Sequence, residues 1–164
     1  MQELYADEKW TSEKTEGGST LFIAASRQED GARDPDVYAS DKMMAIILAK
    51  ETGKDVFLLP ERSPFRNPDC FFDGGTMELK HVRGGRNKVG KNAMEALKQS
   101  PNVFLFIDKN IPVDSCISKI AGSIQICRRS LAEKGKHFLE PPKDARLYLY
   151  TEGKLYEGTW ADVL

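Results

Sequence analysis

Residues 67–80 read Asn-Pro-Asp-Cys-Phe-Phe-Asp-Gly-Gly-Thr-Met-Glu-Leu-Lys, and this pattern predicts a β-hairpin. Apolar residues occupy every second position on both sides of a Gly-Gly pair, and such a pair readily adopts the two positive φ angles of a tight hairpin turn. If Gly74 and Gly75 form the loop, the expected cross-strand pairs are Asp73 with Thr76, Phe71 with Glu78 and Asp69 with Lys80. The rest of the fold is expected to build on this hairpin.

The register of the hairpin separates a charged face from an apolar one. Side chains alternate between the two faces of a strand, so Asp69, Glu78 and Lys80 are expected on one face. The opposite face is expected to carry the apolar residues Cys70, Phe72, Met77 and Leu79. This prediction requires an even number of loop residues, because a three-residue loop would place Asp69 and Glu78 on opposite faces.

Two carboxylates and one ammonium group on a single face suit metal-assisted hydrolysis of a phosphodiester bond. Carboxylate oxygens such as those of Asp69 and Glu78 are the ligands that Mg²⁺ or Mn²⁺ prefers. The metal lowers the pKa of a bound water, and a lysine can orient that water or offset charge on the phosphate. Asp69 and Glu78 are therefore candidate metal ligands, and Lys80 is a candidate catalytic residue.

The arrangement Pro68-Asp69, eight residues, then Glu78-Leu79-Lys80 resembles the motif of the PD-(D/E)XK nuclease superfamily. Residues 48–61, Leu-Ala-Lys-Glu-Thr-Gly-Lys-Asp-Val-Phe-Leu-Leu-Pro-Glu, together with this motif resemble the C-terminal nuclease domains of bacterial contact-dependent growth inhibition toxins and related phage-associated domains. The resemblance covers about residues 39–108. It implies a Mg²⁺- or Mn²⁺-dependent endonuclease, with RNA, such as transfer RNA, favoured over DNA. It also implies a cognate immunity protein as partner and delivery to the cytoplasm as a toxin domain.

The composition sets broad limits on the class of protein. With 164 residues, of which 40% are hydrophobic and 30% charged, the chain is long enough to form a globular domain with a substantial core. The net charge of −1 indicates no particular partner. No run approaches the roughly 18 apolar residues of a membrane span, so no membrane partner is expected. The three cysteines, Cys70, Cys116 and Cys127, lack metal-ligand spacing and predict free thiols in a reducing compartment.

Residues 1–38 differ in composition from the rest of the chain. They hold nine acidic and four basic residues, a net charge of −5, around a central Gly17-Gly18-Ser19. We predict that they form an acidic linker or a loosely attached N-terminal extension, followed by a nuclease-like domain at residues 39–164. The apolar run at residues 21–25 is expected to be a short strand at a sheet edge.

Residues 40–51 are predicted to form a buried helix that Ser40 or Asp41 caps and that ends at Gly53. Glu51 lies at the end of its apolar stripe. In the nucleases that the chain resembles, the first helix often contributes a further acid to the site, so Glu51 is expected as an accessory catalytic acid. A last-turn side chain that points to solvent is the alternative.

The sequence becomes basic after the hairpin, with a net charge of +5 over residues 80–98. Glycine-rich basic backbone suits a close approach to phosphates. The candidate nucleic-acid-binding residues are Arg83, Arg86, Lys88 and Lys91. Residues 85–92 also match the Walker A phosphate loop, except that Asn92 replaces the Ser or Thr that binds Mg²⁺. An NTPase is therefore a rival interpretation.

The remaining patterns predict strands at residues 56–59 and 103–107, helices at 91–100 and 113–134, and a hairpin at 146–156. The predicted order is helix, strand, strand, strand, helix, strand, helix, hairpin. We predict an α/β (α+β) fold in which helices flank a central mixed β-sheet. The resemblance implies that this sheet is a PD-(D/E)XK-like core, to which the C-terminal β-hairpin is added.

Two alternatives to a metal-dependent nuclease remain open. A metal-independent, barnase-like ribonuclease needs a general base and a cation at the phosphate, and Thr76, Lys80, His81 and Arg83 can supply them. His81 is a candidate catalytic residue on this basis, although its alternation with Lys80 directs it toward the core. The other alternative is a non-catalytic nucleic-acid-binding or virion structural module.

Overall fold

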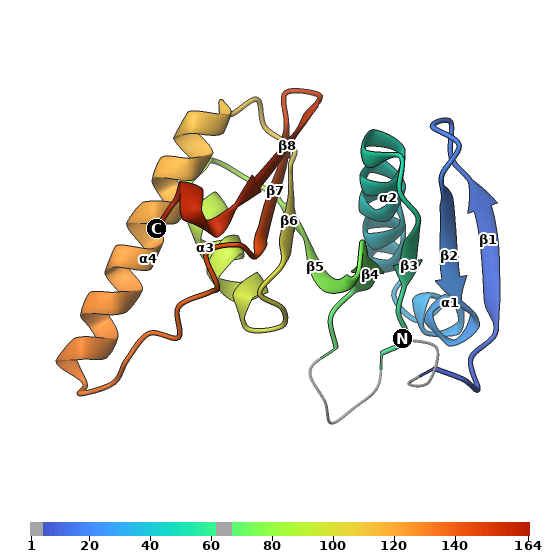
Figure 1. Ribbon diagram of the computed structural model, residues 1–164, viewed down its shortest axis with the longest axis horizontal. Coiled ribbons are helices and arrows are strands. Elements are labelled where there is room, and N and C mark those ends of the chain that lie inside the picture. Colours follow the sequence, from blue (N-terminus) through green and yellow to red (C-terminus); the bar gives the residue numbers. More distant parts are fainter. Residues whose placement is uncertain (1–4, 62–66) are drawn as a thin grey trace. The chain divides into compact units, whose positions relative to one another are not determined.

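The computed structural model describes residues 5–61 and 67–164 (Figure 1). The described residues form a mixed α/β structure with four α-helices and eight strands, whose hydrogen-bonding order follows the order in the chain. The predicted class, a mixed sheet combined with helices, is confirmed. The chain divides into two compact units, Met1–Met77 and Glu78–Leu164, and the boundary lies within strand β5 (Gly75–Val82).

The first unit contains two helices and five paired strand segments. Strand β1 (Trp10–Lys14) pairs antiparallel with β2 (Thr20–Ala24), which runs parallel to β3 (Val56–Leu58). Strand β4 (Cys70–Phe72) pairs antiparallel with β3 and with the first residues of β5. Helix α1 (Ala25–Gly31) follows β2 directly, and helix α2 (Pro35–Thr52) packs on β2 and β3.

Alternation along the strands gives the sheet of the first unit two different faces. Leu21, Val56 and Cys70 are fully buried, as strand residues that face a helix should be. The alternate residues, on the other face of the sheet, are aromatic and half-buried, and their rings contact one another across neighbouring strands. These aromatic residues are Trp10, Phe22, Phe57 and Phe71.

The predicted hairpin is present, but its register differs by two residues from the predicted one. The observed pairs are Cys70 with Met77, Phe71 with Thr76 and Phe72 with Gly75, so the loop is Asp73-Gly74 and not Gly74-Gly75. Asp73 has φ 46° and Gly74 has φ 83°, the two positive angles that a type I′ turn requires and that aspartate tolerates. The loop still has an even length, as the prediction required.

Helix α2 begins earlier than predicted, at Pro35 and not at Ser40. The Asp34 side chain accepts a hydrogen bond from the Val37 amide at 3.4 Å, and proline is favoured in the first turn of a helix. Gly53 ends the helix in the left-handed conformation, as predicted. The boundary that we expected after residue 38 does not coincide with the unit boundary, and β2, from within residues 1–38, lies inside the sheet with β1 at its edge.

The second unit is a parallel sheet with an added hairpin. Strands β5, β6 (Val103–Ile107) and β7 (Arg146–Thr151) are parallel, and β8 (Lys154–Thr159) pairs antiparallel with β7. Helices α3 (Arg86–Leu97) and α4 (Val113–Glu133) connect the parallel strands. The β7–β8 turn is Glu152-Gly153, again with two positive φ angles. The predicted strand at 103–107, helix at 113–134 and C-terminal hairpin are confirmed.

The core of the second unit lies between the parallel sheet and its two helices. Val89 of α3, Ile120 of α4 and Leu105 of β6 belong to one buried cluster. Trp160, which begins the 3₁₀ helix Trp160–Asp162, belongs to the same cluster. Gly90 allows α3 and α4 to approach closely, because a Cβ atom there would lie 2.7 Å from the Lys119 carbonyl oxygen. In the described part of the chain, no helix is long and apolar enough to cross a membrane.

The three cysteines are free thiols, as predicted. Cys70 in the first unit and Cys116 in the second are buried, whereas Cys127 is half-buried. Burial raises the pKa of the Cys116 thiol to about 11, so this group stays protonated and unreactive at neutral pH.

Candidate functional site

Asp69, the first predicted metal ligand, lies in a buried ion network of the first unit. Its Oδ1 atom accepts a hydrogen bond from Nη2 of Arg27 at 3.1 Å. Its backbone carbonyl accepts a hydrogen bond from the Leu59 amide at 2.9 Å. Both the side chain and the backbone of Asp69 are thus held immediately before strand β4 begins.

Arg27 is the centre of this network, although a charged residue is rarely buried so completely. It exposes 3% of its surface. Nη1 donates to the Leu59 carbonyl oxygen at 3.0 Å, and Nη2 donates to Oδ2 of Asp41 at 2.6 Å as well as to Asp69. The more exposed Glu61 lies 3.8 Å from Nη1. Since a buried guanidinium without partners would be very costly, these acceptors are what allow Arg27 to lie inside the unit.

The carboxylates around Arg27 outnumber its single positive charge. Burial lowers the pKa of Arg27, but Asp69 and Asp41 raise it, and the net shift is upward. Burial, and next the charge of Asp69, raise the pKa of Asp41 to about 6 even though Arg27 lowers it. Asp41 therefore gains a proton more readily than an ordinary aspartate does.

The other two residues of the predicted motif, Glu78 and Lys80, lie together in the second unit. Nζ of Lys80 is 3.4 Å from Oε1 of Glu78, as expected for residues two positions apart on one strand face. Glu78 exposes 4% of its surface, whereas the Lys80 side chain exposes 33%. The pair therefore consists of a buried carboxylate and an ammonium group that reaches solvent. The predicted clustering of Glu78 with Lys80 is present.

His81 is half-buried, and it lies on the face of strand β5 that is opposite to Glu78 and Lys80. Its Nε2 atom is 3.4 Å from Oδ2 of Asp108. The imidazole meets the Phe106 ring edge-on, and Phe106 stacks on Tyr150 at 5.6 Å between centroids. His81 is thus not part of the cluster between the sheet and helices α3 and α4, which its neighbour Val82 joins.

The predicted nucleic-acid-binding residues lie on the surface of the second unit around the start of α3. Arg83, Arg86, Lys88 and Lys91 are all exposed. The residue that precedes α3 is Gly85, which has no side chain to cap the helix, and no acid lies in the first turn. Because Arg86 already begins the helix, most of the Walker A-like stretch is helical. The predicted start of this helix at residue 91 was wrong, and the stretch cannot wrap around phosphates as a Walker A loop does.

Glu51, the expected accessory acid, is exposed in the last turn of α2. The buried residues of this helix are Asp41, Met44, Ala45, Leu48 and Ala49, so the acid on its inward face is Asp41. Among residues 5–61 and 67–164, no three His, Cys, Asp or Glu side chains are grouped as ligands for one metal ion.

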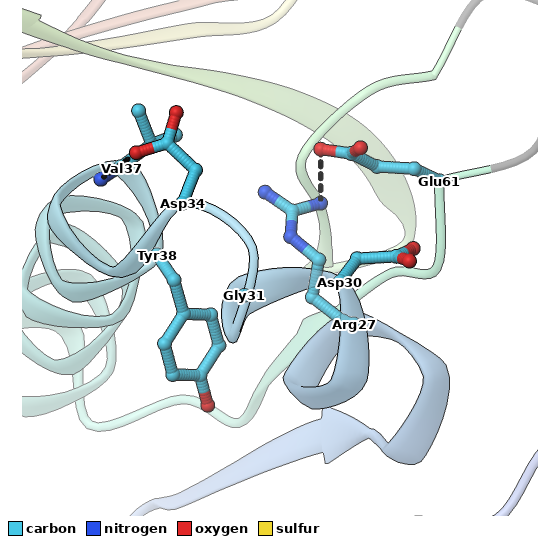
Figure 2. Close-up of a pocket in the computed structure, with 7 residues that line it drawn as sticks. All are labelled: Arg27, Asp30, Gly31, Asp34, Val37, Tyr38 and Glu61. Atoms are coloured by element: carbon cyan, nitrogen blue, oxygen red, sulfur yellow. Dashed lines mark hydrogen bonds and ion pairs between the residues drawn. The ribbon is translucent and has the colours of Figure 1, made fainter.

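A pocket opens beside Arg27 on the first unit (Figure 2). Figure 2 shows Arg27 of α1 and Glu61 pointing toward one another, with Tyr38 of α2 on the other side of Gly31. Three acids, Asp30, Asp34 and Glu61, are among the residues that line the pocket. The ring of Tyr38 lies against Gly31, where a Cβ atom would come within 2.5 Å of it.

Sequence reasoning missed Arg27 and the role of Asp41. Arg27 stands in a stretch that the acidic composition marked as a linker, and Asp41 was assigned to a helix cap. Their partners are distant in the chain, so no local spacing connects Arg27 to Asp41 or Asp69. One available signal was the apolar strand Thr20–Ala24, which ends three residues before Arg27 and so brings this part of the chain close to the core.

Comparison of the chain with protein-family models, curated proteins and solved structures finds no match. The function is therefore inferred from the residues and their chemistry.

Proposed function

We propose that this protein is a metal-dependent nuclease that hydrolyses phosphodiester bonds, with RNA as its substrate. The observation that carries the proposal is the Glu78–Lys80 pair on β5, in which a buried carboxylate lies 3.4 Å from a partly exposed ammonium group. Glutamate is almost never fully buried unless it is paired, and active sites are places where charged groups are buried next to a partner. The order of elements α2, β3, β4, β5, α3 and β6 also supports a PD-(D/E)XK-like core.

The predicted ligands fit Mg²⁺ in chemical kind. Mg²⁺ is usually held by one or two protein carboxylates and retains several waters, so a group of three protein ligands is not required. Glu78 and Asp69, the two carboxylates of the sequence motif, would supply the oxygens. When bound, the ion lowers the pKa of a water and offsets charge that develops on the phosphate.

The remaining residues have roles that follow from their own chemistry. Lys80 can donate hydrogen bonds to a phosphate oxygen or to the attacking water, and Glu78 holds its ammonium group in place. The exposed cations Arg86, Lys88 and Lys91 surround the uncapped start of α3, where the helix dipole also favours anions. These residues are suited to hold the phosphate backbone of a nucleic acid.

A metal-independent ribonuclease is the second candidate, and the His81–Asp108 pair favours it. A histidine whose ring nitrogen lies 3.4 Å from a carboxylate is oriented as a general base often is. Arg83 follows shortly after in the chain and can approach a phosphate. In this case Asp69 and Glu78 would have structural roles.

Cleavage of total transfer RNA, with plasmid DNA in parallel, distinguishes the two candidates. With Mg²⁺ present we expect RNA cleavage that excess EDTA abolishes and that Asp69→Asn abolishes without loss of RNA binding. Asp73→Asn is the matched control, because Asp73 is an exposed acid of the same hairpin that pairs with Lys54. Cleavage that persists in EDTA and is lost in His81→Gln would overturn the metal mechanism. Binding without any cleavage would indicate a non-catalytic module.

A further inference from the structure

We propose that Arg27 is a positioning residue that orients the Asp69 carboxylate for metal binding. This inference rests on the proposed function, because it concerns Asp69 as a metal ligand. It adds a residue that the nuclease motif does not include and that lies 42 positions away from Asp69 in the sequence.

The hydrogen bonds around Asp69 form a closed loop of three residues. Arg27 donates to the Asp69 carboxylate at 3.1 Å and to the Leu59 carbonyl oxygen at 3.0 Å, and the Leu59 amide donates to the Asp69 carbonyl oxygen at 2.9 Å. The guanidinium therefore binds the side chain of Asp69 and also binds the residue, Leu59, that is hydrogen-bonded to the backbone of Asp69. Such a loop restricts the χ angles of a residue that stands outside the regular part of β4.

Arg27 is itself held from a second element. Its Nη2 atom donates to Asp41 of α2 at 2.6 Å, and the side chains of Arg27, Asp41 and Asp69 expose 4%, 12% and 14% of their surfaces. Because the guanidinium is planar and presents its donors in a fixed fork, it can bind α2, Leu59 and Asp69 at once. A lysine would keep the charge but could not reproduce this geometry.

Stability alone does not account for such a network. Buried ion pairs contribute little net stability, because desolvation offsets most of their attraction, and apolar replacements of similar volume are often as stable. What the network supplies is a defined orientation for the acid, because Arg27 donates to Asp69, Asp41 and Leu59 at once. Residues that orient a ligating carboxylate typically affect metal affinity or activity by about 10- to 100-fold.

The test compares Mn²⁺ affinity, measured by electron paramagnetic resonance or calorimetry, in two matched variants. Arg33→Lys, the control, makes the same exchange at an exposed arginine of the first unit, and we expect its Mn²⁺ affinity to stay within about threefold of the original chain. Arg27→Lys keeps the cation but removes the fork. In this variant we expect Mn²⁺ binding about 10- to 100-fold weaker, and kcat reduced by a similar factor with KM for RNA unchanged.

The outcomes separate this inference from the proposed function. If the original chain binds Mn²⁺ and Arg27→Lys binds it equally well, the positioning role is wrong and the nuclease proposal stands. If the original chain binds no Mn²⁺, the proposed function fails and the inference fails with it. A thermal unfolding curve in EDTA identifies variants that are folded, and the double variant Arg27→Lys/Asp41→Asn, which also removes one of the carboxylates around position 27, should show the same loss of affinity. A lower midpoint with unchanged Mn²⁺ affinity would show that Arg27 is only structural.

Discussion

The two units of this protein carry opposite net charge and use their charged residues differently. Residues 1–77 contain fifteen acids and nine Lys or Arg residues, whereas residues 78–164 contain ten acids and fifteen Lys or Arg residues. In the first unit Arg27 is buried among carboxylates. In the second unit the cations around the start of α3 are exposed. The buried cation of the first unit is thus paired with carboxylates of the same unit, whereas the second unit presents its cations to solvent.

The variant with the largest expected effect tests whether the second unit supplies a catalytic acid. Glu78→Gln removes the charge of a buried carboxylate that lies beside Lys80, and we expect cleavage to fall by about 10³-fold, because a metal site supplies several kcal/mol to the transition state. The measurement is the single-turnover rate of RNA cleavage. Glu95→Gln is the control, since Glu95 is an exposed acid of α3 that pairs with Lys98. Equal rates for both variants would remove Glu78 from the mechanism.

The next effect concerns the basic surface. Replacing Arg86, Lys88 and Lys91 together with Gln should raise KM for RNA about tenfold near 0.1 M salt. It should also flatten the slope of log KM against log salt concentration by about 2, because each phosphate contact on a single strand contributes about 0.7. The stability of helix α3 should not fall, since cations near the N-terminus of a helix interact unfavourably with its dipole.

A matched triple variant of the first unit provides the control for the basic surface. Lys9, Lys14 and Arg33 are also exposed, and their replacement by Gln should change KM less than twofold. If both triple variants had the same effect, RNA binding would not be confined to the second unit.

A smaller effect concerns the stability of the second unit. Gly90→Ala places a Cβ atom 2.0 Å from Ser123 Oγ and 2.7 Å from the Lys119 carbonyl oxygen, so helices α3 and α4 must separate. We expect a loss of about 1–3 kcal/mol in unfolding free energy and a drop of about 3–8 °C in Tm. Gly122→Ala on α4 meets no atom within 4 Å and should instead stabilise the protein by about 0.5–1 kcal/mol. Thermal unfolding followed by circular dichroism compares the two, and a neutral Gly90→Ala would contradict the close helix packing.

The last prediction concerns how the free energy of unfolding of the first unit depends on pH. The pKa of Asp41, which faces Arg27, Asp69 and Glu61, is raised to about 6 from an ordinary value near 4. The folded state then binds the proton more tightly, so this group favours folding below about pH 4 and loses that contribution as the pH rises through 6. We expect the difference to be on the order of 3 kcal/mol, since each pKa unit corresponds to about 1.4 kcal/mol. Urea unfolding of Asp41→Asn should show a flatter pH profile between 4 and 6; an unchanged profile would show that Asp41 does not titrate there.

Local patterns predicted most of the fold. The hairpin, strands β3 and β6 and helix α4 follow from alternation, helical spacing and turn residues, and these signals lie within a few residues of one another. The turn was misplaced by one residue, and the pairing register therefore by two, because Asp73 adopts the positive φ that we assigned to Gly75. The start of α2 was misplaced because the acidic composition of residues 1–38 obscured the Asp34-Pro35 capping signal.

The candidate site was predictable only where its residues are neighbours in the chain. Glu78 and Lys80 are two positions apart, and strand geometry alone brings them together. The partners of Asp69 were not predictable, because Arg27 and Asp41 come from helices far away in the sequence and their association depends on how α1 and α2 pack. The inward-facing acid of α2 was misidentified as Glu51, since the apolar stripe was extended toward the wrong end of the helix.

The buried thiols allow the two units to be followed separately by chemical labelling. Cys70 lies in the first unit and Cys116 in the second, and both are shielded from solvent. An alkylating reagent can modify such a thiol only when the surrounding structure opens. The rate of labelling at each position therefore reports the free energy of opening of one unit, and a peptide mass map would reveal whether the acidic or the basic unit opens first.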